Sequence, residues 1–416
     1  MHRQVATLAT AQAIFQTAST LVMTVGGLAG AALARDPALA TLPIAGMFLG
    51  TAAVTFPASL WMARVGRRAG FVAGAFLGVA GGVIAAAGVF IGSLWLLAAG
   101  TFLVGAYQAF AQFYRFAAGE AADEAFRPRA IALVLAGGVA AAFLGPWLAR
   151  VGGPLLEPVY VGSFLLLALA SLLGAGVLMT LRGSETAGAP SQDEPRGRPW
   201  LGIVTQPSYL VALFGAATGY GVMILAMAAT PIAMLHHDHE LGAAATVIQF
   251  HVLGMFAPSF FSGSLISRFG VRRVMLAGVA LMGLHVAVAA SGVGFGTFAA
   301  ALVLLGVGWN FLYVGGTTLL TTTYAPAERG RAQATNDMII FVVGLLSSLA
   351  AGAMVERFGW RDMNLMLLPW LAAAGLVLVW QEARAVTGAA RQEARPGARA
   401  RSCQARRSKR PKIGRL

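Results

Sequence analysis

The sequence predicts an all-α polytopic membrane protein with twelve transmembrane helices, arranged as two pseudo-symmetric six-helix bundles. Two observations lead to this fold class. Of the 416 residues, 58% are hydrophobic and 11% are charged, whereas about a quarter of the residues are charged in an ordinary soluble domain. Apolar runs longer than the roughly 18 residues that indicate a membrane span occur along most of the chain. Twelve spans leave room only for short loops and tails, so we expect no soluble catalytic domain and no enzyme activity.

The apolar runs fall into two sets of six predicted spans. The first set covers residues 5–32, 39–62, 70–92, 94–117, 130–150 and 159–181, and the second covers 208–235, 242–265, 273–293, 297–322, 333–355 and 363–381. The first run is similar to a signal peptide, because Ala32-Leu33-Ala34 matches a cleavage pattern. The apolar stretch from Val5 to Ala34 is nevertheless at least about twice as long as the hydrophobic region of a signal peptide. We therefore expect it to be a retained first transmembrane helix.

Polar segments divide the chain into four parts. Residues 184–207 are rich in Gly, Pro, Ser and charge, and we expect them to form a cytoplasmic linker between bundles over residues 1–183 and 208–381. Residues 382–416 form a basic tail, since eleven of the 30 Lys and Arg lie from Gln381 onward. Beside a membrane span, such a cluster indicates the cytoplasmic side and contact with anionic lipid more often than nucleic-acid binding. We expect membrane lipid, and no nucleic acid, as its partner.

The placement of basic residues predicts the orientation in the membrane. With both termini in the cytoplasm, 26 of the 30 Lys and Arg lie on the cytoplasmic side, and Arg35, Arg150, Arg357 and Arg361 lie outside. Basic residues concentrate in the cytoplasmic loops of membrane proteins. We therefore expect a multi-pass protein with both termini in the cytoplasm.

A short basic motif occurs twice in the chain. Arg64, Gly66 and Arg68 are repeated 204 positions later as Arg268, Gly270 and Arg272, in both cases between the second and third predicted spans of a half. Two six-helix halves repeated in the same orientation, with this basic loop, resemble the major facilitator superfamily. The resemblance implies a transporter whose substrate site lies between the halves near the middle of the membrane.

The same loop suggests a gate. The signature of that superfamily, G-x-x-x-D-R-x-G-R-R, contains an acidic residue that both copies lack here. The partner must then come from elsewhere, and Asp337 is our candidate, because it starts the eleventh span and an unpaired charge there is costly. We predict a cytoplasmic gate of Arg64, Asp337 and Arg268. The alternative is that these arginines only set the topology.

Two pairs of side chains form a candidate metal site. Met223 and Met227 lie one helical turn apart in the seventh span, as do His251 and Met255 in the eighth. A hairpin centred at residue 239 places both pairs at matching depths, and thioether with imidazole suits a soft ion such as Cu(I). The alternative is that methionine only fills the core.

The loop between these two spans is rich in histidine. It reads His236-His237-Asp238-His239-Glu240, and His236, His237 and His239 are candidate residues for metal entry at the outer face. A hydrophilic turn is an equally good interpretation.

These residues make the chain similar to the CcoA-type copper importers of the major facilitator superfamily. The two motifs of that family match Met223-x-x-x-Met227 and His251-x-x-x-Met255. The resemblance implies a secondary transporter in a bacterial inner membrane, and we expect a monomer. It would import copper ions, as substrate rather than cofactor, by alternating access for cytochrome oxidase assembly. The alternative function is transport of riboflavin or another small organic solute, with Trp309, Tyr313 and Tyr107 stacking on the substrate.

Overall fold

The computed structural model describes residues 2–35, 39, 42–181 and 198–384, and within these ranges the regular structure is helical. The N-terminal helices are α1 (His2–Leu33), α2 (Leu42–Val65), α3 (Arg67–Phe90), α4 (Leu94–Ala111), α5 (Tyr114–Glu120), α6 (Arg127–Ala136), α7 (Gly138–Gly152) and α8 (Val161–Met179). The C-terminal helices are α9 (Trp200–Val204), α10 (Pro207–His236), α11 (Leu241–Phe256), α12 (Ser259–Phe269), α13 (Val271–Ser291), α14 (Phe295–Leu320), the 3-10 helix η2 (Pro326–Glu328) and α15 (Arg329–Leu365). A last helix covers residues 368–384. The first part of the predicted linker and nearly all of the predicted tail lie outside the described residues.

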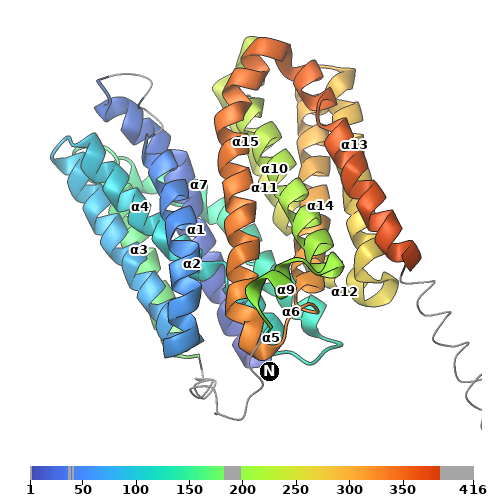
Figure 1. Ribbon diagram of the computed structural model, residues 1–416. Helices are drawn as coiled ribbons and strands as arrows, with labels where there is room; N and C mark the ends of the chain where they lie inside the picture. Colours follow the sequence, from blue (N-terminus) through green and yellow to red (C-terminus); the bar gives the residue numbers. More distant parts are fainter. Residues whose placement is uncertain (1, 36–38, 40–41, 182–197, 385–416) are drawn as a thin grey trace, which may run out of the picture.

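Eleven stretches of the described chain are long and apolar enough to cross a membrane. The last of them, Pro326–Arg384, has 59 residues, far more than the roughly 20 that one pass requires. Gly359 breaks its helix with a φ of +73°, a conformation that glycine adopts without steric cost. The chain reverses after this residue, so the stretch contains two passes (Figure 1). The predicted all-α fold with twelve passes is thus confirmed.

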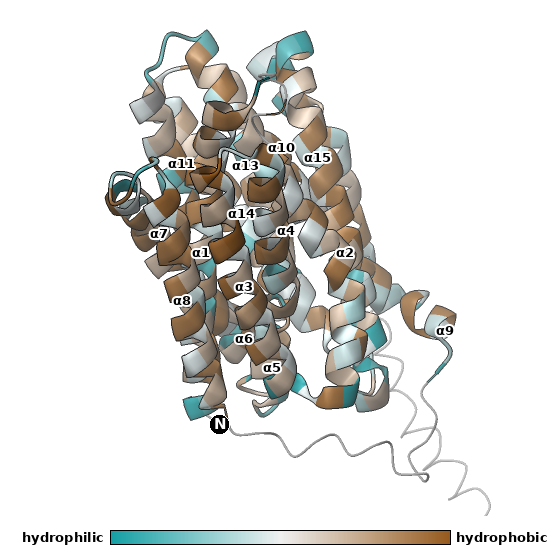
Figure 2. Ribbon diagram, turned by 90° about the vertical axis from the view of Figure 1, so that its left-hand side faces the viewer, coloured by the Kyte–Doolittle hydropathy of each residue, from teal (hydrophilic) through white to brown (hydrophobic). Residues whose placement is uncertain are grey.

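The helices gather into two groups that Figure 1 shows side by side. In the N-terminal half, α3 packs on α4 and α8, α2 on α4, and α1 on α7 and α8. In the C-terminal half, α14 packs on α10, α11 and α13, and α15 packs on α10. Contacts between the halves come mainly from α2 with α15 and from α6 with α12. Hydrophilic residues gather toward the two ends of the bundle, as expected for a membrane protein (Figure 2).

Glycine allows helices α2 and α4 to approach closely. A Cβ atom added to Gly50 would lie 2.0 Å from the carbonyl oxygen of Phe102, and one added to Gly105 would lie 1.9 Å from that of Met47. Within a membrane, helix association depends on such close packing, because lipid is as apolar as the side chains. Any larger residue at Gly50 or Gly105 would force the two helices apart.

The repeated motif has the same backbone conformation in both halves. Gly66 caps α3 with φ and ψ of 89° and 158°, and Gly270 caps α13 with 88° and 148°. Positive φ values strain residues that carry a Cβ atom. The two glycines therefore have one structural role, a sharp turn between consecutive passes.

The end of the predicted linker is fixed to the C-terminal half. Arg198 donates hydrogen bonds through Nε and Nη2 to the two carboxylate oxygens of Glu328, at 2.8 and 2.7 Å. Glu328 is buried, and its carboxylate raises the pKa of Arg198. Trp200 of α9 donates a hydrogen bond to Thr335 of α15 at 3.0 Å. Residues 198–206 thus pack against the protein, whereas the sequence predicts a polar linker throughout 184–207.

Candidate site between the two halves

The two halves meet at one end of the bundle, which we call the basic end because Arg67, Arg129, Arg268 and Arg329 lie there. It is the lower end in Figure 1, where the two groups of helices converge, whereas their ribbons diverge toward the opposite end. Ser59 of α2 donates a hydrogen bond across the interface to the carbonyl oxygen of Gly330 in α15, at 2.8 Å. The structure is therefore closed at the basic end.

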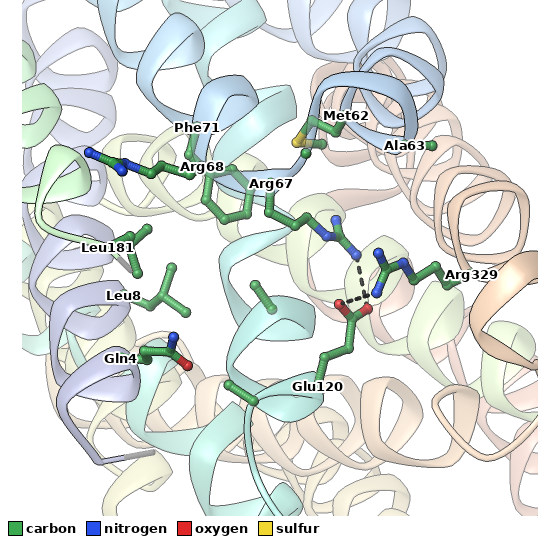
Figure 3. A pocket seen from close by; sticks show the side chains of 13 residues that line it. Gln4, Leu8, Met62, Ala63, Arg67, Arg68, Phe71, Glu120, Leu181 and Arg329 are labelled. Atoms are coloured by element: carbon green, nitrogen blue, oxygen red, sulfur yellow. Dashed lines mark hydrogen bonds and ion pairs between the residues drawn. The ribbon is translucent and has the colours of Figure 1, made fainter. Parts of the chain in front are cut away.

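Glu120, the last residue of α5, holds this end together. One of its carboxylate oxygens lies 2.9 Å from Arg67 of the same half, and the other lies 3.4 Å from Arg329 of the C-terminal half (Figure 3). Gln333 of α15 joins them, since its amide donates to Glu120 at 2.9 Å and accepts from Arg67 at 2.7 Å. Glu120 is thus an acidic partner for the signature loop, and it comes from the fourth pass.

A buried ion pair joins the halves deeper in the bundle. Nη2 of Arg115 on α5 lies 2.7 Å from Oδ1 of Asp337 on α15, and the two side chains are 2% and 1% exposed. Nη1 of Arg115 donates to Gln112 at 2.7 Å and also to the hydroxyl of Tyr313 on α14. Charges at this depth are costly unless paired, and they indicate function.

Aromatic side chains of the C-terminal half lie next to this ion pair. The rings of Trp309 and Tyr313 on α14 are stacked, with centroids 4.8 Å apart and planes 17° apart. Phe256 of α11 meets Trp309 edge-on at 5.8 Å, and Tyr220 of α10 lies 6.1 Å from Tyr313. The guanidinium of Arg115 lies 4.5 Å from the centre of the Tyr313 ring. A cation, an anion and stacked aromatic surfaces thus lie together between the halves.

Several buried polar atoms of this cluster have no hydrogen-bond partner among the described residues. They include Nε of Arg115, Oδ2 of Asp337 and Nε1 of Trp309. Buried polar groups in proteins are nearly always hydrogen-bonded. Two free donors and one free acceptor can therefore satisfy a bound polar ligand.

Comparison with known proteins identifies the family. A sequence model of the Major Facilitator Superfamily matches residues 8–257 and again residues 211–413. This chain belongs to the Major Facilitator Superfamily. The riboflavin transporter RfnT of Brucella anthropi is 40% identical to this transporter over 379 residues, which are 91% of this chain and 94% of that protein. The uncharacterized transporter YdeG of Bacillus subtilis is 29% identical and covers 87% of this chain and 88% of its own length.

Solved structures show the same fold. FucP in its outward conformation superposes with a TM-score of 0.69 at 16% identity, covering 90% of this chain and 98% of its own. The human organic anion transporter MFSD10 superposes with a TM-score of 0.72 at 12% identity, covering 91% of this chain and 99% of its own. This chain therefore has the multi-pass fold of these transporters, which agrees with its membership of the family.

The predicted gate pairing of Arg64 with Asp337 is wrong. Asp337 pairs with Arg115, while Arg64 and Arg268 are both exposed. Arg268 lies over the ring of Phe269 at 5.2 Å. The physical reason is depth, because Arg64 and Arg268 lie at helix ends near the water, whereas Arg115 lies among buried aromatic residues on the helix that faces Asp337.

The four predicted metal ligands lie on two helices of the C-terminal half. Met223, His251 and Met255 are buried, and Met227 is half-buried. Nδ1 of His251 lies 2.8 Å from the carbonyl oxygen of Leu302 on α14. Among the described residues no hydrogen bond links His251 to α10, so the four-ligand site stays a prediction.

The three loop histidines have separate surroundings. His236 lies 3.3 Å from Glu356 of α15, and His239 lies 2.7 Å from the carbonyl oxygen of Val293. His237 is exposed. In the described part of the chain, no group of three or more His, Cys, Asp or Glu is placed to hold a metal ion. The role of these histidines in metal entry stays a prediction.

Sequence reasoning missed Arg115 and Glu120. The available signal was an arginine within an apolar span, between Tyr114 and Phe116, because such a charge requires a partner. Sequence reasoning also grouped Tyr107 with Trp309 and Tyr313. Tyr107 instead lies in the core of the N-terminal half, where its ring meets Phe15 edge-on at 5.0 Å.

We predict that Glu120→Gln loosens the basic end. The change removes the charge that pairs with Arg67 and Arg329, and each partly exposed pair contributes about 0.2–1 kcal/mol. A single cysteine at position 59, in a chain with Cys403→Ser, should then react with a thiol reagent up to about fivefold faster. Glu124→Gln is the matched control, because Glu124 is exposed at the next loop. Equal labelling rates in both variants would show that Glu120 does not close this end.

Proposed function

We propose that this protein is a secondary transporter that takes up riboflavin, or a similar solute with a planar heteroaromatic ring, by alternating access. The observation that carries the proposal is the stacked pair of Trp309 and Tyr313 beside the buried pair of Arg115 and Asp337. The riboflavin transporter that is 40% identical over 91% of the chain supports the same substrate class.

The side chains suit such a ring. Stacking of an aromatic side chain on a planar heterocycle contributes about 1–3 kcal/mol per ring to the free energy of binding. The ring of riboflavin carries carbonyl oxygens and an N–H group at one edge. The free Nε of Arg115 offers a donor to such an edge, and Oδ2 of Asp337 offers an acceptor.

Alternating access then follows from the position of the ion pair. Arg115 belongs to the N-terminal half and Asp337 to the C-terminal half. A substrate that accepts a hydrogen bond from Arg115 and donates one to Asp337 competes with their mutual pairing, and this differential binding shifts the equilibrium between closed and open states. Opening of the basic end also requires Glu120 to release Arg329.

We further propose that the basic end faces the cytoplasm of a bacterial cell, with the protein in the inner membrane. The arginines at this end support that orientation through the positive-inside rule. An importer must be closed at its cytoplasmic end when it receives substrate from the outside, and closure at the basic end fits that requirement.

The test is uptake of radiolabelled riboflavin and of radioactive copper in cells that express the protein or carry the empty vector. We expect riboflavin accumulation above the vector level and copper accumulation equal to it. Copper accumulation without riboflavin accumulation would replace this proposal with the copper function.

One observation favours copper as a second candidate. Nδ1 of His251 faces a carbonyl oxygen and must therefore donate, which leaves the lone pair of Nε2 free in a fully buried position. An imidazole nitrogen of this kind is a metal ligand. If copper is transported, His251→Ala should abolish copper uptake, while His285→Ala, an equally buried histidine on α13, should retain it.

A further inference from the structure

Four glutamines of the N-terminal half lie within membrane passes. Gln12 and Gln16 are one helical turn apart on α1, and Gln108 and Gln112 are one turn apart on the fourth pass, so each pair shares one face of its helix. Polar side chains at this depth are costly against lipid, so they face other helices or a polar space inside the protein. We call these four residues the glutamine face.

The glutamine face lies at the same two depths as the stacked rings of the C-terminal half. Gln16 and Gln108 lie within two residues of the middle of their passes, as Trp309 does in α14. The other member of each pair, like Tyr313, is four residues nearer to the basic end, about 6 Å along the helix. The hydroxyl of Tyr313 donates to Oε1 of Gln112 at 3.1 Å, so the face and the rings meet at the lower of these depths.

The amides of this face keep free hydrogen-bond donors. Nε2 of Gln12 donates to Oε1 of Gln16 at 3.4 Å, and the hydroxyl of Thr51 donates to Oε1 of Gln108 at 3.3 Å. Nε2 has no hydrogen-bond partner among the described residues in Gln16, Gln108 or Gln112. Solvent reaches these three nitrogens, which are not fully enclosed by the protein. They can therefore donate to a ligand without any rearrangement.

Such amides suit hydroxyl groups better than ions. A hydroxyl group both donates and accepts, and so does a glutamine amide, so a chain of hydroxyls can pair with a row of amides. After Arg3, helix α1 contains no charged residue, and α4 and α14 contain none. The charges of Arg115 and Asp337 already neutralise each other. A charged group on the substrate would therefore lack a partner, which is costly at this depth.

We propose that the glutamine face binds an uncharged polyhydroxyl chain attached to the aromatic ring of the substrate, while Trp309 and Tyr313 hold the ring itself. Amides on one side and rings on the other lie at matching depths, so one molecule with a planar ring and a polyol chain contacts both. The ribityl chain of riboflavin is a chain of this kind. This inference rests on the proposed function and names the second part of the substrate that the site recognises.

The experiment measures the binding of three flavins to the full-length purified protein in detergent, through quenching of flavin fluorescence. Riboflavin carries the ribityl chain, lumiflavin has a methyl group in its place, and flavin mononucleotide adds a phosphate to the chain. We expect wild type to bind riboflavin about tenfold more tightly than lumiflavin, because the hydrogen bonds of the chain are lost. Flavin mononucleotide should also bind about tenfold more weakly than riboflavin, since its phosphate lacks a partner.

Gln16→Leu combined with Gln108→Leu tests the residues themselves. This double variant should bind riboflavin about tenfold more weakly than wild type and should bind lumiflavin equally well. The single variant Gln16→Leu should lie between the two for riboflavin. The matched control is Gln4→Leu, the same change on α1 twelve residues nearer to the basic end, which should bind both flavins as wild type does.

The outcomes separate this inference from the proposed function. Equal affinities of wild type for riboflavin and lumiflavin, or wild-type riboflavin affinity in the double variant, would overturn the inference and leave the proposed function intact. If the double variant loses both flavins, Gln16→Leu decides by the same comparison. Binding of flavin mononucleotide at least as tight as that of riboflavin would overturn the preference for an uncharged chain. No flavin binding and no riboflavin uptake by wild type would contradict the proposed function, and the inference with it.

Discussion

Asp337→Asn should abolish substrate uptake and lower the stability of the closed state by about 3–5 kcal/mol, because it leaves the buried guanidinium of Arg115 without its charged partner. Arg115 is 2% exposed, so water cannot replace the lost carboxylate. The measurements are riboflavin uptake in cells and thermal unfolding of the purified protein. A protein that unfolds at the wild-type temperature after Asp337→Asn would contradict the role of this ion pair.

A double variant separates transport from stability. Arg115→Gln with Asp337→Asn removes both charges, so neither is left unpaired, and neutral replacements of buried ion pairs are often tolerated. We expect this double variant to recover most of the lost stability and to remain inactive in uptake. Uptake at the wild-type rate by the stable double variant would show that the charges serve packing alone.

Trp309→Ala should reduce riboflavin uptake at low substrate concentration by about five- to 150-fold, because the loss of one stacking face costs about 1–3 kcal/mol. The indole stacks on Tyr313 and is 3% exposed. Trp309→Phe keeps an aromatic face and should retain more uptake than Trp309→Ala. The measurement is the initial rate of uptake across a riboflavin concentration series.

The matched control for this series is Trp95→Ala. Trp95 lies in the first turn of α4 and is 69% exposed, toward the opposite end of the fourth pass from Arg115. Its removal should leave uptake unchanged. If Trp309→Ala and Trp95→Ala reduce uptake equally, the stacked pair does not bind the substrate.

The number and the limits of the passes depend on local sequence. Each pass requires about 20 apolar residues, whatever its neighbours are, because lipid surrounds it. The bounds of the predicted spans 208–235 and 273–293 therefore agree within two residues with those of α10 (Pro207–His236) and α13 (Val271–Ser291). The repeat of Gly66 and Gly270 was likewise recognisable in the sequence, and the structure shows that each glycine forms a sharp turn of the local backbone.

The motifs and the comparison with relatives favour different substrate classes. Met223, Met227, His251 and Met255 suggested copper, yet the riboflavin transporter of Brucella anthropi is 40% identical to this chain over 91% of its length. Spacing along a helix shows which residues share a face, but it does not show which neighbour that face meets. His251 illustrates this, because its ring is hydrogen-bonded to α14.

The sequence by itself determined the membrane fold, the repeat and the basic end, because hydrophobic length, glycine turns and charge act within a few residues. Only the tertiary structure decided that Asp337 pairs with Arg115, that Glu120 joins Arg67 to Arg329, and that Tyr107 lies apart from Trp309. Each of these outcomes depends on how a helix is rotated about its axis, and one residue along a helix changes that direction by about 100°. The rotation is fixed by packing between distant segments, which no local pattern contains.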